Sequence, residues 1–186
     1  MFLVIGLGNT GKEYNNTRHN IGFRILDILS DHCRLDFQKK TKFNALIASR
    51  DSAKPYILCK PETYMNLSGE AVCAVASYYK ITLDKIIVFH DDIDLSLGKI
   101  KCKIGGGAGG HNGLRSIDRL VGSNYHRIRI GVGRPKEAGY AVSDFVLGKF
   151  SSDEELVMSK TMDLIVKNFD LLINEDIEGF KKVISS

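Results

Sequence analysis

The sequence predicts an α/β fold, namely a single three-layer α/β/α domain (residues 1–186) around a mixed, mostly parallel, twisted sheet. Apolar segments typical of strands alternate along the chain with segments of helical spacing, as in that fold class. Residues 86–89 form a short continuous apolar run between charged residues, which is typical of a parallel strand buried on both faces. The length and the lack of repeats or linker-like segments favour one domain.

The first half of the chain predicts three strands and two helices. Residues 1–7 read as a buried strand, followed by a polar loop over 8–18 and a helix that ends near Cys33. Residues 43–49 and 55–59 read as two strands joined through a turn at 51–54, which predicts a hairpin. A helix over 67–79 follows, with Asn66 or Ser68 as its N-cap.

The second half predicts a buried strand over 86–89 and two strands, 100–104 and 128–132, in which basic and apolar residues alternate as on half-exposed strands. A short amphipathic helix lies between them, with apolar residues from Leu114 to Val121. Ser152 and Glu155 predict a capping box for a helical tail whose apolar stripe is Met158, Met162, Ile165, Phe169 and Leu172. A last short helix is expected over 176–184.

Charge is unevenly distributed, although the net charge is only +4. Residues 99–136 contain nine Lys or Arg and one acidic residue, Asp118. This excess indicates either a solvated basic face or a polyanionic partner, of which nucleic acid is the first candidate. The four cysteines are widely spaced without a C-x-x-C pair, and no segment reads as a signal peptide or a membrane span, so a reducing, cytoplasmic location is expected.

Two glycine-rich loops invite a nucleotide-binding interpretation, and both fail it. Gly6-Leu-Gly-Asn-Thr-Gly11 follows a strand, but residues 12–20 are too polar for the helix that a dinucleotide site needs. That loop is expected to present Asn9 instead. In the second loop, residues 103–113, His111 and Asn112 stand where a phosphate-binding loop requires Lys and Ser or Thr. Its glycines and the following helix start predict a site for an anion or a developing oxyanion.

An acidic cluster, Asp91, Asp92 and Asp94, follows the strand at 86–89, where open α/β sheets keep their sites. The spacing does not fit a calcium loop, while a magnesium or zinc site with His90 stays open. Asp91 is the candidate acid that orients a histidine, and the other two acids read as caps or solvated residues. Among the histidines, His32 and His126 are expected to be structural and His90 half-buried. His19 is either a catalytic base or a capping residue.

Five motifs occur together and in order, which makes the match specific. They are Gly6-Leu-Gly-Asn-Thr-Gly11, Thr17-Arg-His-Asn-Ile-Gly22, Lys60-Pro-Glu-Thr-Tyr-Met-Asn-Leu-Ser-Gly69, His90-Asp-Asp-Ile-Asp94 and Gly105-Gly-Gly-Ala-Gly-Gly-His-Asn-Gly113. The set closely resembles the bacterial peptidyl-tRNA hydrolases, over essentially the whole chain and including Phe145-Val-Leu-Gly148. The first loop departs from the family pattern, because Thr10 replaces the usual proline.

The resemblance implies hydrolysis of the ester between a peptide and tRNA by a monomer that uses no cofactor, metal or membrane. His19 would be the general base and Asp91 its orienting partner. The resemblance further implies substrate contacts by Asn9, Tyr14, Met65, Asn66, His111 and Asn112, and tRNA phosphate contacts by Lys103 and Arg129. The partner would be peptidyl-tRNA, held by its acceptor stem and terminal adenosine. The alternative is a non-catalytic RNA-binding protein on the same fold.

Overall fold

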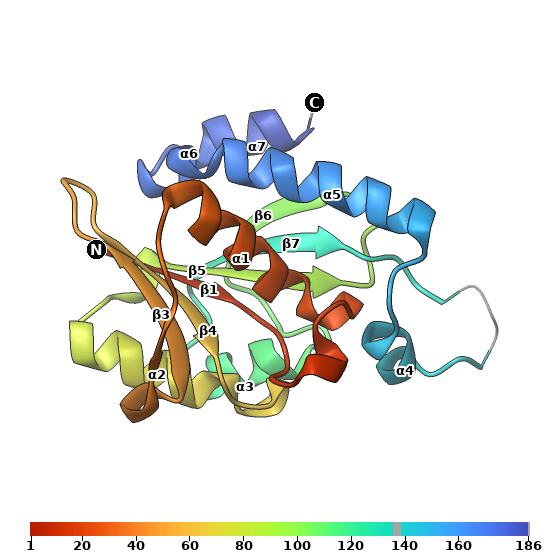
Figure 1. Ribbon diagram of the computed structural model, residues 1–186, viewed down its shortest axis with the longest axis horizontal. Coiled ribbons are helices and arrows are strands. Elements are labelled where there is room, and N and C mark those ends of the chain that lie inside the picture. The colour runs from red at the N-terminus through yellow and green to blue at the C-terminus, as the bar shows by residue number, and fades with distance from the viewer. Residues whose placement is uncertain (136–138, 186) are drawn as a thin grey trace.

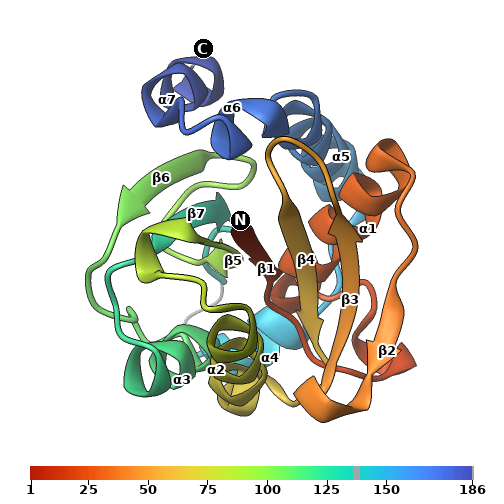
Figure 2. The same cartoon turned by 90° about the vertical axis from the view of Figure 1, so that its left-hand side faces the viewer.

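The computed structural model describes residues 1–135 and 139–185. Within these, one seven-stranded sheet has the order β2-β3-β4-β1-β5-β7-β6 (Figures 1 and 2). Its central strands β4, β1, β5 and β7 are parallel, and the outer strands β3, β2 and β6 pair antiparallel. The bounds are β1 Phe2–Gly6, β2 Gln38–Lys40, β3 Ala45–Arg50, β4 Tyr56–Pro61, β5 Ile86–Asp92, β6 Ile100–Ile104 and β7 His126–Gly131. The predicted α/β class, the hairpin and the buried parallel strand are confirmed.

Helices cover both faces of the sheet, which gives the three predicted layers (Figure 1). One face carries α1 (Ile21–Cys33), α5 (Ser152–Lys167), α6 (Phe169–Ile173) and α7 (Ile177–Ser185), which pack on one apolar cluster. The other carries α2 (Ser68–Tyr79) and α3 (Asn112–Leu120), which pack on a second cluster. The short helix α4 (Val142–Leu147) lies beyond the carboxyl ends of the central strands (Figure 1).

Single turns of 3-10 helix lie at Lys12–Tyr14, Arg18–Asn20, Thr41–Phe43, Met65–Leu67 and Leu83–Lys85. Two of them lead directly into α1 and α2. The turn Arg18–Asn20 therefore places His19 immediately before α1, at the edge of the sheet where β1 and β5 end.

Two glycines allow α1 to start directly on those strand ends. A Cβ on Gly22 would lie 2.4 Å from the Leu7 nitrogen and 2.5 Å from the Phe89 oxygen, and one on Gly6 would lie 2.2 Å from the Gly22 oxygen. Any side chain at either position would push the helix away. This close approach is what brings His19 to the end of β5.

Several local predictions are wrong. The capping box joins Ser151 and Glu154 rather than Ser152 and Glu155, because α5 begins at Ser152, so that Ser151 is the N-cap and Glu154 is the third helical residue. The apolar tail is broken at Asn168 into α5 and α6.

Among the described residues, no helix is long and apolar enough to cross a membrane.

Buried polar residues on β5 and β7 also differ from the prediction. His90 is 2% exposed rather than half-buried, because β5 is central in the sheet. Arg127 is fully buried, so it does not belong to the exposed basic surface that the charge count suggested. Lys136, counted there too, lies outside the described residues.

Candidate active site

A cleft of about 700 Å³ opens at the carboxyl ends of the parallel strands. The loops that follow β1 and β5 reach the same edge of the sheet, because both strands run in the same direction. The lining residues that matter below come from the loop after β1 (Asn9), the turn before α1 (His19), β5 (Asp91), β6 and β7 (Lys103, Arg129), the turn before α2 (Met65, Asn66), the loop before α3 (His111, Asn112) and α4 (Val142, Val146, Leu147).

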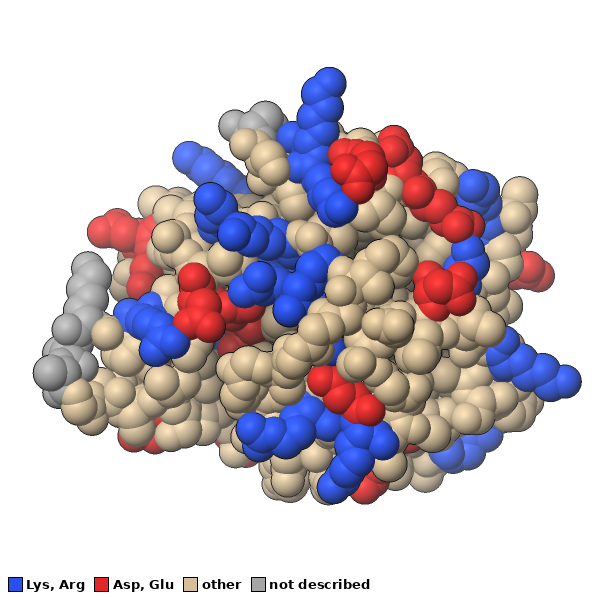
Figure 3. Space-filling view, turned by 180° about the vertical axis from the view of Figure 1, so that it is seen from behind, with Lys and Arg blue, Asp and Glu red and all other residues tan. Residues whose placement is uncertain are grey.

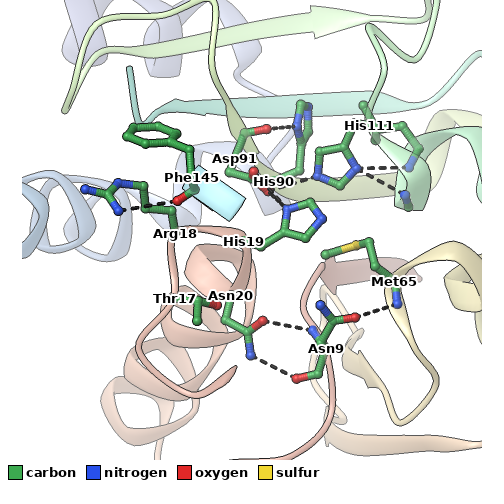
Figure 4. A network of polar contacts seen from close by, with 12 residues as sticks. Asn9, Thr17, Arg18, His19, Asn20, Met65, His90, Asp91, His111 and Phe145 are labelled. Carbon is green, nitrogen blue, oxygen red and sulfur yellow. Dashed lines mark hydrogen bonds and ion pairs between the residues drawn. The ribbon is translucent and has the colours of Figure 1, made fainter. Parts of the chain in front are cut away.

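Asp91 forms the centre of the site and contacts two histidines (Figure 4). Its side chain is buried, and each carboxylate oxygen lies 2.9 Å from Nδ1 of His19. One of the two oxygens also lies 2.9 Å from Nε2 of His111. Since an ionised carboxylate only accepts hydrogen bonds, both imidazole nitrogens donate to it. The predicted pairing of His19 with Asp91 is present, whereas sequence reasoning missed the contact of His111 with Asp91.

The start of α3 determines which ring nitrogen of His111 donates to Asp91. Nδ1 of this residue accepts hydrogen bonds from the backbone N–H groups of Gly113 (3.1 Å) and Leu114 (3.4 Å), which makes His111 the N-cap of the helix. A nitrogen that accepts carries no proton, so in this geometry the Nε2 atom of His111 is the one that carries a proton. His111 therefore gives Asp91 a hydrogen bond from Nε2.

The contact with Asp91 leaves Nε2 of His19 as the ring nitrogen that is available at the cleft. Nδ1 carries the proton that Asp91 accepts, and Nε2 has no hydrogen-bond partner within residues 1–135 and 139–185. Burial alone lowers the pKa of His19, but the charge and the hydrogen bond of Asp91 outweigh it, so the pKa lies above its ordinary value. Burial alone would raise the pKa of Asp91, and the two histidines hold it well below its ordinary value.

His90 lies next to this site without sharing its chemistry. Nδ1 donates to the backbone oxygen of Asp91 at 2.7 Å, and burial, followed by the proximity of His111, lowers the pKa of His90 to about 3. His90 is therefore a neutral structural residue. Asp92 and Asp94 pair with Arg129 and Arg134, so this arrangement does not support a metal site made of His90 and these acids.

The only described group with metal-ligand geometry is His19, Asp91 and His111. The hydrogen bonds within this group already account for its geometry.

Asn9 is held on both sides, which sets the direction of its amide (Figure 4). The side chain of Asn20 binds both backbone groups of Asn9. Its Oδ1 accepts from the Asn9 backbone N–H and its Nδ2 donates to the Asn9 backbone oxygen, both at 2.9 Å. Oδ1 of Asn9 accepts from the Met65 N–H at 2.8 Å. The amide group that remains to act on a ligand is Nδ2, a hydrogen-bond donor. Sequence reasoning missed Asn20, although its place directly after His19 in a shared motif was a usable signal.

The other predicted substrate residues differ in their position. Asn66 is exposed and lines the cleft, and Asn112 lines it from the first position of α3, where its Oδ1 accepts from Arg115 at 3.1 Å. Met65 is buried beneath the cleft, 4% exposed. Tyr14 is not part of the lining, and its backbone oxygen accepts a hydrogen bond from Thr17.

A basic margin, defined here as Lys103 and Arg129, also lines the cleft, from β6 and β7. Nε of Arg129 donates to Asp92 at 2.7 Å, and Lys103 forms no ion pair with a described residue. Lys and Arg side chains gather near the centre of the face seen in Figure 3, with a few acidic groups among them. The margin fits an anionic ligand.

Arg127 has a different role from the basic margin. It donates to the backbone oxygen of Gly107 at 2.9 Å and to Asp118 at 2.8 Å, so it ties the glycine loop to α3. A Cβ on Gly107, Gly109 or Gly110 would meet nothing within 4 Å, and the φ angles of the last two are +57° and +83°. Glycine is needed at these two positions for backbone conformation, not for close packing.

Comparison with known proteins identifies the family of this chain. The family model described as peptidyl-tRNA hydrolase matches residues 3–186. The chain belongs to the peptidyl-tRNA hydrolase family.

Among the relatives, a peptidyl-tRNA hydrolase of Rickettsia bellii (strain RML369-C) is 54% identical over 182 residues, which cover 97% of this chain and 98% of the relative. That of Rickettsia canadensis is 51% identical over 185 residues, covering 99% and 100%. A crystal structure of the peptidyl-tRNA hydrolase of Acinetobacter baumannii superposes with a TM-score of 0.94 at 37% identity, covering 99% of this chain and 94% of that one. Family membership and fold, as the motifs indicated, are confirmed.

Proposed function

We propose that this protein hydrolyses the ester bond that joins a peptide to tRNA, and releases the peptide and free tRNA. The observation that carries the proposal is the His19–Asp91 pair, in which one imidazole nitrogen is held by a buried carboxylate while the other is available at the cleft. Family membership supports the same reaction, since the curated relatives are named peptidyl-tRNA hydrolases.

In the proposed mechanism, Nε2 of His19 takes a proton from a water molecule that attacks the ester carbonyl. Asp91 keeps the proton of His19 on Nδ1 and stabilises the imidazolium that forms. Collapse of the tetrahedral intermediate expels the ribose oxygen, which receives the proton from Nε2. His19 thus returns to its starting state, and the reaction consumes one water.

Side-chain amides stabilise the developing oxyanion in this scheme. Nδ2 of Asn9 is a fixed donor because Met65 and Asn20 hold the rest of the residue. Asn112 also presents an Nδ2 donor, because its oxygen accepts from Arg115. Asn66 and Met65 position the acyl group and His111 supports Asp91, while Lys103 and Arg129 hold phosphates of the acceptor stem that leads to the terminal adenosine.

Discrimination between N-acylated and free aminoacyl-tRNA tests this proposal. A peptide offers an amide to the asparagines, whereas a free aminoacyl ester presents an ammonium whose desolvation is costly, and the acid nearest to it, Asp91, is committed to two histidines. Sites that require such hydrogen bonds reject analogues by roughly four orders of magnitude. The measurement is kcat/KM for the acetylated and unacetylated forms of one aminoacyl-tRNA. Equal values would leave a general aminoacyl esterase as the better description.

The alternative, a non-catalytic RNA-binding protein, needs the basic margin but no ordered base in the cleft. The fixed tautomers of His19 and His111 disfavour it. Peptide release from purified peptidyl-tRNA in the presence of EDTA distinguishes the two, because only the proposed metal-free esterase works under those conditions.

We propose further that the protein acts as a cytoplasmic monomer without a nucleotide cofactor. The four cysteines are free, which fits a reducing compartment. Neither glycine loop has the residues that hold a pyrophosphate, so saturable binding of NAD or ATP in calorimetry would contradict this part of the proposal.

A further inference from the structure

Arg18 is a buried arginine directly before His19, and it points away from the reacting atoms. Figure 4 shows His19 directed to Asp91 and Arg18 directed to Phe145. Arg18 is only 9% exposed. A buried guanidinium is costly unless it is paired, so its partners show what it is there to hold.

Those partners lie in and just after α4. Nη1 of Arg18 donates to the backbone oxygens of Lys149 (2.8 Å) and Phe145 (3.4 Å), and the backbone N–H donates to Gly148 (3.0 Å). The guanidinium carbon lies 4.3 Å from the centre of the Phe145 ring, within the range of a cation–π contact. Arg18 thus holds the C-terminal end of α4 by its backbone and by one ring.

Glu154 completes the attachment. Nη2 of Arg18 donates to Oε2 of Glu154 at 2.8 Å, and the same oxygen accepts the N–H of Ser151 in the capping box of α5. One residue therefore joins the turn that carries His19, the end of α4 and the start of α5.

Other residues of α4 face the cleft. Val142, Val146 and Leu147 line it together with Ser143, so most of the side chains of this wall are apolar, and Lys103 and Arg129 line the same cleft from β6 and β7. An apolar wall suits the side chain of the esterified amino acid, and the basic margin suits RNA phosphate.

We propose that Arg18 is a positioning residue that sets the gap between His19 and the apolar wall of α4, and thereby determines how the enzyme discriminates the last amino acid of the peptide. The proposal rests on the proposed function. A shift of α4 changes contacts with the amino-acid side chain, whereas the chemistry at His19 is unaffected, since the charge of Arg18 is balanced by Glu154.

The test uses Arg18→Lys, which keeps the charge and loses the planar fork that reaches two carbonyls and a carboxylate. The substrates are N-acetylglycyl and N-acetylleucyl esters of one tRNA. We expect KM for the leucyl substrate to rise roughly tenfold, a much smaller rise for the glycyl substrate, and little change in kcat. The acid limb of the pH profile should stay in place.

The chain offers a matched control in Arg24→Lys. Arg24 forms a bidentate ion pair with Glu155, at 3.0 and 2.7 Å, which joins α1 to α5. Arg24 contacts no residue of α4 in the described structure. This variant should leave both KM values unchanged.

Equal rises in KM for both substrates, or unchanged KM in a folded Arg18→Lys variant, would overturn the inference. If Arg18→Lys does not fold, Glu154→Gln carries the test, because glutamine still accepts from Ser151 but removes the charge that holds Arg18, and the same leucyl-specific rise is expected. A wild-type protein that cleaves neither substrate would instead contradict the proposed function.

Discussion

Two regions of the cleft, the surroundings of Asp91 and the basic margin, use charged groups in opposite ways. Around Asp91 the groups have little exposure, since the side chains of His19, Asp91 and His111 are 12%, 3% and 8% exposed, and the two histidines hold the carboxylate. At the basic margin, Arg129 remains partly exposed at 22% and pairs with Asp92. The region around Asp91 can hold a proton at a defined atom, which affects the transition state. The basic margin can attract an anion, which affects the ground and transition states alike.

Because of this difference, we expect substitutions around Asp91 to change mainly kcat and substitutions at the basic margin to change mainly KM. The largest expected effect is that of replacing the proposed base, His19. His19→Ala should lower kcat by roughly a hundredfold or more, the usual contribution of a general base, while tRNA affinity changes little. Steady-state kinetics together with direct binding of free tRNA measure the two quantities. Near-normal turnover in this variant would refute the mechanism.

Asp91→Asn should lower kcat by roughly tenfold or more and should also move the pH profile. The asparagine amide must turn a donor toward one of the two histidine N–H groups, which disturbs the tautomer of His19. Asp91 is what keeps the pKa of His19 above its ordinary value, and the base works in its neutral form. The acid limb of kcat/KM should therefore lie above the ordinary histidine pKa in the wild type and move to lower pH in the variant. An unmoved limb would mean that another group controls it.

Lys103→Ala and Arg129→Ala should each raise KM several-fold, roughly tenfold at most at low salt, with a smaller change in kcat. Each removes a phosphate contact, so the slope of log affinity for tRNA against log salt should flatten by about one unit. Unchanged slopes in both variants would show that the basic margin is only a solvated face.

Asp92→Asn should give the smallest effect, and in the opposite direction. It neutralises the partner of Arg129, so the guanidinium becomes a stronger anion site and KM should fall by about twofold at low salt. The decrease should vanish at high salt, where exposed charges are screened. A rise in KM would indicate that Asp92 serves to orient Arg129 rather than to weaken it.

The sequence predicted the contact of His19 with Asp91 better than it predicted the residues around that pair. His19 and Asp91 are 72 residues apart, yet each lies in a motif at the end of a predicted strand or loop, and a parallel sheet brings such ends together. Tyr14 was expected to contact the substrate, but it does not line the cleft. Its position in the polar loop after the first strand did not reveal this.

By itself, the sequence determined the α/β class, the buried central strand, the family and the chemical groups of the site, because these follow from local periodicity and from motifs. Only the tertiary structure decided which polar groups share a partner. The second hydrogen bond to Asp91 depends on His111 at the start of α3, the bracket around Asn9 depends on Asn20, and the burial of Arg18 depends on Glu154, 136 residues away. A long side chain such as Arg127 or Arg18 has the same sequence signature on a surface as in a buried network. Its role is therefore set by which elements pack beside it.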